Sequence, residues 1–200
     1  MVQISSRNPV YYAYANDPEG ILVEIEEVDV AALELETLPK HNFRLRQISL
    51  ATPDMDRILA FYSELLEEQH PRRIGKWLSL SGDKIDAISG LPESKLEMAW
   101  FQTRNLEIEI VQYHSHPPKS DKAERPLNAH GYNLIMFEVA DLSRLKTRLQ
   151  SVGADIILEH HDLDGLPVLF TRDPDGNLLG FQPSDINNAL SGAKFKNNGI

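Results

Sequence analysis

A carboxylate closes one copy of a repeated block and is absent from the other. The block spans residues 14–24 near the start of the chain and residues 170–180 near its end, and its final residues are Glu24 and Gly180. The Glu24 carboxylate can ligate a cation through oxygen or act as a general acid or base. Gly180 offers no side chain for either purpose. The repeat therefore predicts a shared local structure, whereas its last position predicts different chemistry in the two copies.

Each copy of the block contains a turn signal. Asp-Pro-Glu-Gly at 17–20 and Asp-Pro-Asp-Gly at 173–176 combine a proline, which presets φ, with a glycine, which accepts positive φ. Because an aromatic-rich run precedes each turn and an alternating run follows it, both blocks are predicted to be β-hairpins.

The first hairpin needs a surface to dock on. An isolated hairpin is only marginally stable in water, so we expect it to pack on a sheet of its own chain or of a partner subunit. Strand alternation gives it an apolar face and a more polar face, formed by Ile21, Val23 and Ile25 and by Leu22, Glu24 and Glu26, respectively.

A second, longer repeat supplies the elements that position these residues. Residues 47–66 and 134–153 align without a gap, and each copy reads as a strand, an aspartate and a helix. Asp54 and Asp141 are predicted N-caps, because the apolar residues that follow them recur at helical spacing. Three strand-like runs follow each helix, at 76–80, 96–102 and 106–113 in the first copy and at 155–161, 168–172 and 177–182 in the second. The unit is therefore βαβββ, present twice, which predicts an α+β fold.

Strand alternation also divides the residues of these strands between a helix-facing side and a concave side. The consistently apolar set is expected to pack beneath the helices: Ile48, Leu50, Ile108, Ile110, Ile135, Phe137, Val139, Leu179 and Phe181. The other set is expected to line a hollow: Gln47, Ser49, Ala51, Glu107, Glu109, Val111, Leu134, Met136, Glu138, Leu178, Gly180 and Gln182.

This order of elements resembles the vicinal-oxygen-chelate superfamily, which includes glyoxalase I, methylmalonyl-CoA epimerase, extradiol dioxygenases and the bleomycin- and fosfomycin-resistance proteins. The resemblance spans residues 41–183, and the stretches 90–99 and 106–113 are most similar to the glyoxalase and epimerase branch. It implies that the two βαβββ modules form one cupped mixed sheet, to which the N-terminal β-hairpin is an addition. Members of the superfamily hold a divalent metal in the hollow through the first and last strands of each module.

The resemblance places the four ligand positions at Gln47, Glu109, Leu134 and Gly180, of which only the first two carry donor atoms. It implies one divalent ion (Ni, Zn, Mn or Fe) bound by Gln47 and Glu109, with Glu24 as a candidate for the missing carboxylate. In glyoxalase-type isomerisation a metal-bound carboxylate moves the proton, and Glu109 can take that role here. An extradiol ligand set would retain only Gln47. The predicted substrate contacts are Ser49, Val111, Tyr113, Leu134, Met136, Gly180 and Gln182.

Histidines are further candidate ligands. His114 and His116 follow the Glu109 strand into a polar, proline-rich loop that reaches His130. Two residues apart on an extended chain, the pair can share a metal with Glu109, although a plain loop position is the commoner role for such residues. His160 and His161 are predicted to lie at a hairpin end.

Composition excludes several classes of partner. Thirty acidic residues against twenty basic give a formal charge of -10, which opposes binding to nucleic acid and to anionic membrane surfaces. No run of about 18 apolar residues is present, so no membrane-spanning helix is predicted. The absence of cysteine excludes disulfides. A cytoplasmic location is the default expectation, although zero cysteine suits an export compartment equally well, and a homodimer is expected.

The expected organisation is a hairpin and linker at 1–40, a first module at 41–115, a polar histidine- and proline-rich loop at 116–130, a second module at 131–183 and a polar tail at 184–200. Three functions stay open. The chain can be a metal-dependent lyase or isomerase of glyoxalase type or a dioxygenase relative, acting on a small molecule between the modules. It can instead be a metal-free small-molecule-binding protein of the bleomycin-resistance type, or a catalytically inactive assembly subunit.

Overall fold

The computed structural model describes residues 1–3, 10–28, 45–67, 70–104, 106–118, 128, 131–161, 165–187 and 191–194. The expected linker at 31–41 and His130 lie outside these residues, as do parts of the expected loop at 116–130 and of the tail. Among the described residues, no helix has the length and apolar character needed to cross a bilayer.

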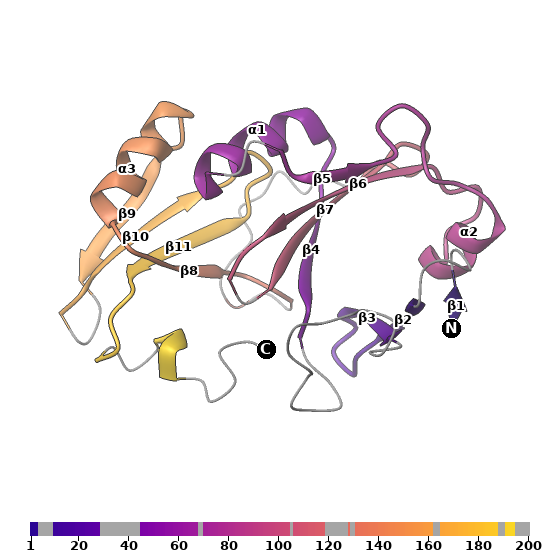
Figure 1. The fold of residues 1–200 in the computed structure, drawn as a ribbon, viewed down its shortest axis with the longest axis horizontal. Helices are drawn as coiled ribbons and strands as arrows, with labels where there is room; N and C mark the ends of the chain where they lie inside the picture. Colours follow the sequence, from indigo (N-terminus) through magenta and orange to yellow (C-terminus); the bar gives the residue numbers. More distant parts are fainter. Residues whose placement is uncertain are drawn as a thin grey trace.

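The first module is a four-stranded mixed sheet with helix α1 against one face (Figure 1). Its strand order is β4-β7-β6-β5, in which β4 runs parallel to β7 and the other pairs are antiparallel. The elements are β4 (Gln47–Ala51), α1 (Met55–Leu66), β5 (Arg72–Ile74), α2 (Asp83–Ser89), β6 (Leu96–Gln102) and β7 (Glu107–Tyr113).

The second module repeats this arrangement. Its order is β8-β11-β10-β9, with β8 parallel to β11 and the other pairs antiparallel. The elements are β8 (Ile135–Val139), α3 (Leu142–Ser151), β9 (Ile156–His161), β10 (Pro167–Arg172) and β11 (Leu178–Pro183). The duplicated βαβββ topology and the α+β class are therefore confirmed.

The strand expected at 76–80 is wrong. The short strand β5 precedes it, Trp77 and Leu78 are 92% and 85% exposed, and the segment pairs with the sheet only through a single bridge from Leu80 to Leu96. The additional helix α2 follows, beginning after Gly82 without a side-chain cap.

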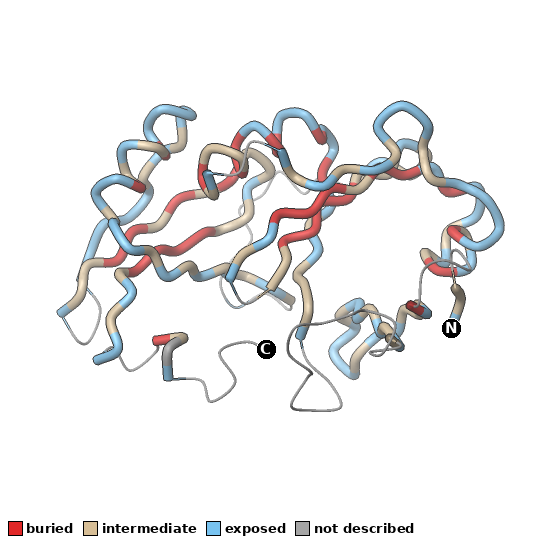
Figure 2. The backbone as a smooth tube through the Cα atoms, in the orientation of Figure 1, coloured by how far each residue is buried: buried red, intermediate tan, exposed pale blue. Residues whose placement is uncertain are grey.

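The expected core is confirmed. One cluster of buried side chains joins α1, α3 and the helix-facing sides of both sheets, and it includes Tyr62, Phe101, Ile108, Leu145 and Phe181. The expected N-caps are also confirmed. Asp54 Oδ1 accepts a hydrogen bond from Arg57 N at 3.1 Å, and Asp141 Oδ1 accepts one from Arg144 N at 2.9 Å. Figure 2 shows that burial is concentrated along the strands of the two modules.

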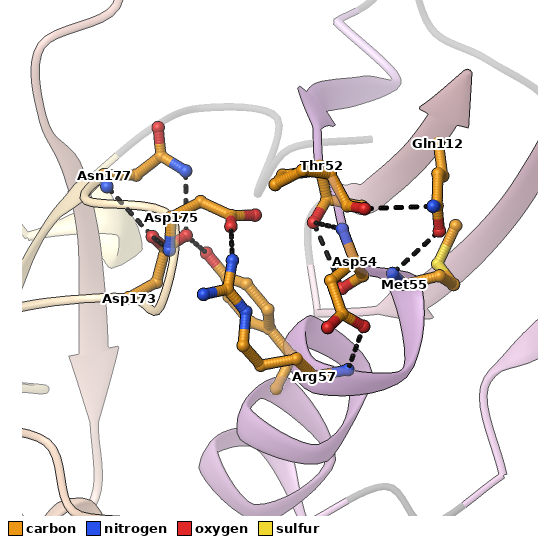
Figure 3. Close-up of polar contacts among 10 residues, drawn as sticks. Thr52, Asp54, Met55, Arg57, Gln112, Asp173, Asp175 and Asn177 are labelled. Carbon is orange, nitrogen blue, oxygen red and sulfur yellow. Dashed lines mark hydrogen bonds and ion pairs between the residues drawn. The ribbon is translucent and has the colours of Figure 1, made fainter. Parts of the chain in front are cut away.

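The turn that closes the second module packs on the start of helix α1, as Figure 3 shows. Arg57 forms an ion pair with Asp175, and the buried hydroxyl of Tyr62 donates to Asp173 Oδ2 at 3.0 Å. These contacts join the two modules across the shared core and hold their sheets in a fixed relation.

The N-terminal segment forms a separate three-stranded antiparallel sheet, β1 (Val2–Gln3), β2 (Val10–Asn16) and β3 (Leu22–Val28). It lies on the side of the first sheet opposite to α1, and the 3₁₀ turn η2 (Gly192–Lys194) lies on the same side of the second sheet (Figure 1). The predicted hairpin is confirmed, and within this chain it docks on the first module.

The face through which the hairpin docks is not the apolar one. Glu24 and Glu26 are turned toward the first module and are partly buried, whereas Val23 and Ile25 are 40% and 49% exposed. Alternation identified the two faces, but it did not determine which one faces inward.

Candidate functional site

Glu109 lies at the centre of the concave face of the first module. It is in the middle of β7, where its neighbours across the sheet are Ser49 on β4 and Trp100 on β6. The residue is only 2% exposed. Its carboxylate accepts hydrogen bonds from the Ser49 hydroxyl, from Gln47 Nε2 at 3.1 Å and from the side chain of Trp100. Three neighbouring strands therefore hold this one carboxylate in place.

The hairpin brings a second carboxylate to the same point. Gln47 Nε2 also donates to Glu24 Oε2, at 2.9 Å. Tyr14, which pairs with Glu24 across the hairpin, hydrogen-bonds to the Glu24 carboxylate. One amide nitrogen of Gln47 thus links an oxygen of Glu24 to an oxygen of Glu109.

Burial dominates the electrostatics of this carboxylate pair. Loss of water raises the pKa of Glu109, although the hydrogen bonds from Ser49 and Trp100 oppose the shift. Burial, followed by the charges of Glu109 and Glu26, raises the pKa of Glu24 to about 7. Burial, together with the carboxylates, also raises the pKa of Tyr113, so this phenol stays neutral at physiological pH.

Arg46, whose charge lowers the pKa of both Glu24 and Glu109, forms its ion pairs with other carboxylates. Arg46 NH1 pairs with Glu26 Oε2 at 2.5 Å, and Arg46 NH2 lies 3.4 Å from Glu107 Oε2. In the described part of the chain, no ion pair involves Glu24 or Glu109. Within the described residues, Glu24 and Glu109 therefore form an acidic centre that lacks an ion-paired cation.

Aromatic and apolar side chains surround this centre. The Trp100 ring is nearly buried, and the Arg72 guanidinium lies 3.9 Å from its centroid, a cation–π geometry. Val111 is buried in a small cluster with Ile85 of α2 and Leu96 of β6. Tyr113 packs on that cluster and remains partly accessible. Ser49 is exposed, so the floor of the hollow is open to solvent along β4.

The expected site residues of the second module form a separate group. Met136 of β8 and Leu134, which directly precedes this strand, are 43% and 38% exposed. A Cβ at Gly180 would lie 2.2 Å from Met136 Sδ and 2.9 Å from Phe170 Cε1, so these side chains fill the space that a ligand at this position would use. Gln182 is buried, and its Nε2 donates to Glu138 Oε1 at 3.4 Å.

Three side chains with carboxylate or amide oxygens meet on the concave face of the first module: Glu24, Gln47 and Glu109. Two carboxylates and an amide oxygen form a donor set suited to a hard or borderline divalent ion. The glutamine amide can present Oε1 where Nε2 now lies, because its two ends are nearly isosteric. A divalent ion would also neutralise the unpaired carboxylates, so these residues fit one. Among the described residues, no three His, Asp or Glu side chains are grouped to hold a metal, so the amide would be needed as the third donor.

The histidines have other contacts. His114 Nε2 lies 3.5 Å from Glu97 Oε2, and Glu97 is on the helix-facing side of β6, away from Glu109. His116 Nδ1 is 2.9 Å from the hydroxyl of Ser115. His160 and His161 are exposed on β9.

Two residues at the site were not identified from the sequence. Trp100 lies on β6, whose residues are apolar on both faces, so alternation did not mark its concave side. Tyr14 could have been found, because the repeat aligns it with Phe170 and places it opposite Glu24.

Comparisons with known proteins agree with this fold. The family model described as Glyoxalase/Bleomycin resistance protein/Dioxygenase superfamily matches residues 44–181. No curated protein matches the sequence.

Solved structures are similar at low sequence identity. A glyoxalase family protein from Bacillus cereus is 23% identical, with a TM-score of 0.61 over 74% of this chain and 98% of that one. The trypanothione-dependent glyoxalase I of Leishmania major is 20% identical, with a TM-score of 0.47 over 71% and 87%. A fosfomycin resistance protein from Listeria monocytogenes is 14% identical, with a TM-score of 0.44 over 69% and 87%.

Proposed function

Because this chain belongs to the Glyoxalase/Bleomycin resistance protein/Dioxygenase superfamily, we propose that it acts on a small organic molecule in the hollow of its first module, with Glu109 moving a proton on that molecule. The observation that carries the proposal is the shared hydrogen bonding of Glu24 and Glu109 to Gln47 Nε2. It gathers acid–base groups where the fold family has its reactive centre.

Glu109 is suited to proton transfer. Its raised pKa brings the carboxylate closer to neutral pH, where a general base and its conjugate acid are both accessible. Ser49 and Trp100 fix its orientation from two sides, so a bound substrate meets a preorganised group. Glu24, with a pKa of about 7, can hold the proton that Glu109 passes on.

A divalent ion (Ni, Zn, Mn or Fe) is part of the proposal. Glu24, Gln47 and Glu109 would hold it, and when bound it would polarise an oxygen of the substrate and acidify the adjacent carbon. Ser49, Val111 and Tyr113 would contact the substrate around this centre. Leu134, Met136, Gly180 and Gln182 would form the opposite wall of the cup, which is apolar except for Gln182.

The test is proton exchange on small carbonyl compounds. A panel of 2-oxo and 2-hydroxy carbonyl compounds is incubated with the Mn²⁺-supplemented protein in D₂O, and deuterium incorporation next to the carbonyl is followed by NMR. Glu109→Gln should lower the exchange rate by about 100-fold or more, because the base is lost and the side-chain shape is kept. Glu159→Gln, on an exposed position of β9, is the control and should exchange like the parent. Equal rates for Glu109→Gln and the parent would remove Glu109 from the mechanism.

A metal-free small-molecule-binding protein is the second candidate. The packing of Met136 and Phe170 over Gly180 favours it, because hydrocarbon takes the place of donor atoms in that half of the cup. Metal analysis separates the two functions. Protein purified without metal should take up one ion per chain from Ni, Zn, Mn or Fe in the first case and none in the second.

We also propose a homodimer. Tyr11, Val23 and Ile25 lie exposed on the outward face of the hairpin, where a second chain would cover them. Light scattering should give the mass of two chains, and the mass of one chain would contradict the dimer.

A further inference from the structure

The N-terminal hairpin and the closing hairpin of the second module have the same structure. In both, the aspartate at the turn accepts backbone hydrogen bonds two and four residues ahead. Asp17 Oδ1 accepts them from Glu19 and Ile21 at 2.9 and 2.8 Å, and Asp173 Oδ1 accepts them from Asp175 and Asn177, both at 2.9 Å. The strand registers also match, because Tyr14 pairs with Glu24 where Phe170 pairs with Gly180.

The two hairpins differ at the position that points into the hollow. In the closing hairpin, Gly180 leaves room for the Met136 thioether and the Phe170 ring. In the N-terminal hairpin, Glu24 retains a carboxylate, and Tyr14 hydrogen-bonds to it instead of filling the space. The carboxylate missing from the second module is therefore present in a copy of the same hairpin, where it meets Glu109.

The N-terminal hairpin is attached to the first module through side chains. It forms its own sheet, and in the described part of the chain no β-ladder joins it to the sheet of the first module. Side chains hold it instead, through Glu24 to Gln47, Glu26 to Arg46, and Lys84 Nζ to Gln3 O at 2.8 Å. Its outward face exposes Val23 and Ile25, whereas its inward face sets Glu24 beside Tyr14 and the buried Val10, so a carboxylate lies within the docking surface. Gln47 Nε2, which donates to both carboxylates, holds Glu24 opposite Glu109.

We propose that the N-terminal hairpin replaces the second module as the other half of the site, and that it closes over the hollow when a divalent ion joins Glu24 to Glu109. This inference rests on the site proposed above but not on the reaction. Tyr14 is its positioning residue, because its hydroxyl fixes the Glu24 carboxylate from the opposite strand. Opening of the hairpin would admit the substrate to Glu109, which is only 2% exposed while the hairpin is docked.

The chain offers a clean spectroscopic reporter. It has two tryptophans: Trp77 is 92% exposed, and the side chain of Trp100 donates a hydrogen bond to the Glu109 carboxylate. In Trp77→Phe protein, Trp100 is the only tryptophan, so excitation beyond the absorption of tyrosine selects it, and Mn²⁺ bound beside Glu109 should quench its fluorescence. The binding constant for Mn²⁺ is measured in this background for the parent, Glu24→Gln and Glu27→Gln. Glu27 lies on the same strand as Glu24 but is exposed on the outward face, so it is the matched control.

We expect saturable quenching with one Mn²⁺ per chain. Glu24→Gln should weaken binding by roughly tenfold or more, since one charged ligand is lost, and Glu27→Gln should stay within about twofold. Hydrogen exchange of residues 10–28 should slow when Mn²⁺ binds the parent and stay unchanged in Glu24→Gln. Tyr14→Phe should keep Mn²⁺ binding but lose part of this protection.

Equal affinities of the parent and Glu24→Gln, unchanged exchange of the hairpin on binding, or no Mn²⁺ binding by the parent would each overturn the inference. The proton-exchange experiment on Glu109→Gln is read separately. If the hairpin fails to respond while Glu109→Gln loses exchange activity, the proposed function stands without this inference. If Mn²⁺ slows hydrogen exchange of the hairpin but Glu109→Gln keeps its proton-exchange activity, the proposed proton transfer by Glu109 is wrong, whereas the metal site at Glu24 and Glu109 stands.

Discussion

Glu24 and Glu109 accept hydrogen bonds from a single nitrogen, Gln47 Nε2, at 2.9 and 3.1 Å. One carboxylate comes from the N-terminal hairpin and the other from the central strand of the first module. No ion pair neutralises either of them in the described part of the chain, since Arg46 pairs with Glu26 and Glu107. When both are ionised, the carboxylates of Glu24 and Glu109 repel each other, and binding of a proton or a cation relieves this repulsion.

In the absence of metal, the free energy of unfolding of the chain should depend on pH through the ionisation of Glu24. The pKa of Glu24 is raised from an ordinary 4.5 to about 7, so the folded chain binds a proton that the unfolded chain has released in this range. This contribution to stability is fully present below about pH 4.5 and is lost as the pH rises through about 7. Glu24→Gln, which cannot ionise, should unfold like the parent at pH 4 and be more stable at pH 8 by roughly 2 kcal/mol, allowing for partial solvent screening.

Urea unfolding in EDTA at several pH values measures this difference. Comparing parent and variant at each pH cancels the titration of all other groups. Glu27→Gln, on the outward face, should show no such trend. A difference between Glu24→Gln and the parent that is constant from pH 4 to 8 would show that Glu24 is solvated in solution.

Gly180 should resist substitution because of Met136. A methyl group at this position would come within 2.2 Å of Met136 Sδ and 2.9 Å of Phe170 Cε1. Gly180→Ala should lower the free energy of unfolding by about 1 kcal/mol, a moderate cost because the partly exposed methionine can move aside. Adding Met136→Ala should cancel part of that loss. Strictly additive effects in urea unfolding would mean that the two side chains do not compete for this space.

Tyr62 should couple the two modules. Its hydroxyl donates to Asp173 Oδ2 at 3.0 Å, and both residues are buried. Tyr62→Phe should lower the free energy of unfolding by about 1.5 to 3 kcal/mol, because a buried carboxylate loses a hydrogen bond. Tyr11→Phe, on the exposed face of β2, should change it little. Chemical denaturation measures both variants, and similar values for the two would rule out the coupling.

The N-caps of α1 and α3 should contribute equally to the free energy of unfolding. Asp54→Ala and Asp141→Ala each remove one side-chain acceptor at a helix start, and each should cost about 1 kcal/mol. Their effects should add, because the caps belong to different helices and have no partner in common. Loss of stability in only one of the two would show that the modules are not equivalent at this level.

The duplicated module could be predicted because each of its signals is local. The spacing after Asp54 and Asp141 sets a helix face, and the period of the strands separates Ile108 from Glu109. Helix α2 was not predicted, because it has only seven residues and its N-cap residue, Gly82, has no side chain to mark the helix start. Lys76 to Leu80 has strand-forming residues, yet no neighbouring strand is placed to pair with Trp77.

Three members of the candidate site could be predicted from the sequence, but their assembly could not. Gln47, Glu109 and Glu24 each stood out from the sequence, since each is a donor on a concave or inward position. Their contact could not be deduced, because it depends on which face of the hairpin points inward. Glu24, which hydrogen-bonds to Gln47, shares the inward face with the buried Val10 of β2, whereas Val23 and Ile25 of the other face stay exposed.

Anomalous diffraction from crystals soaked in MnCl₂ tests the central claim most directly. A single strong peak ligated by Glu24, Gln47 and Glu109 is the predicted result, with the hairpin closed over it. A peak among Leu134, Met136 and Gly180 in the second module, or no peak beside Glu109, would contradict it.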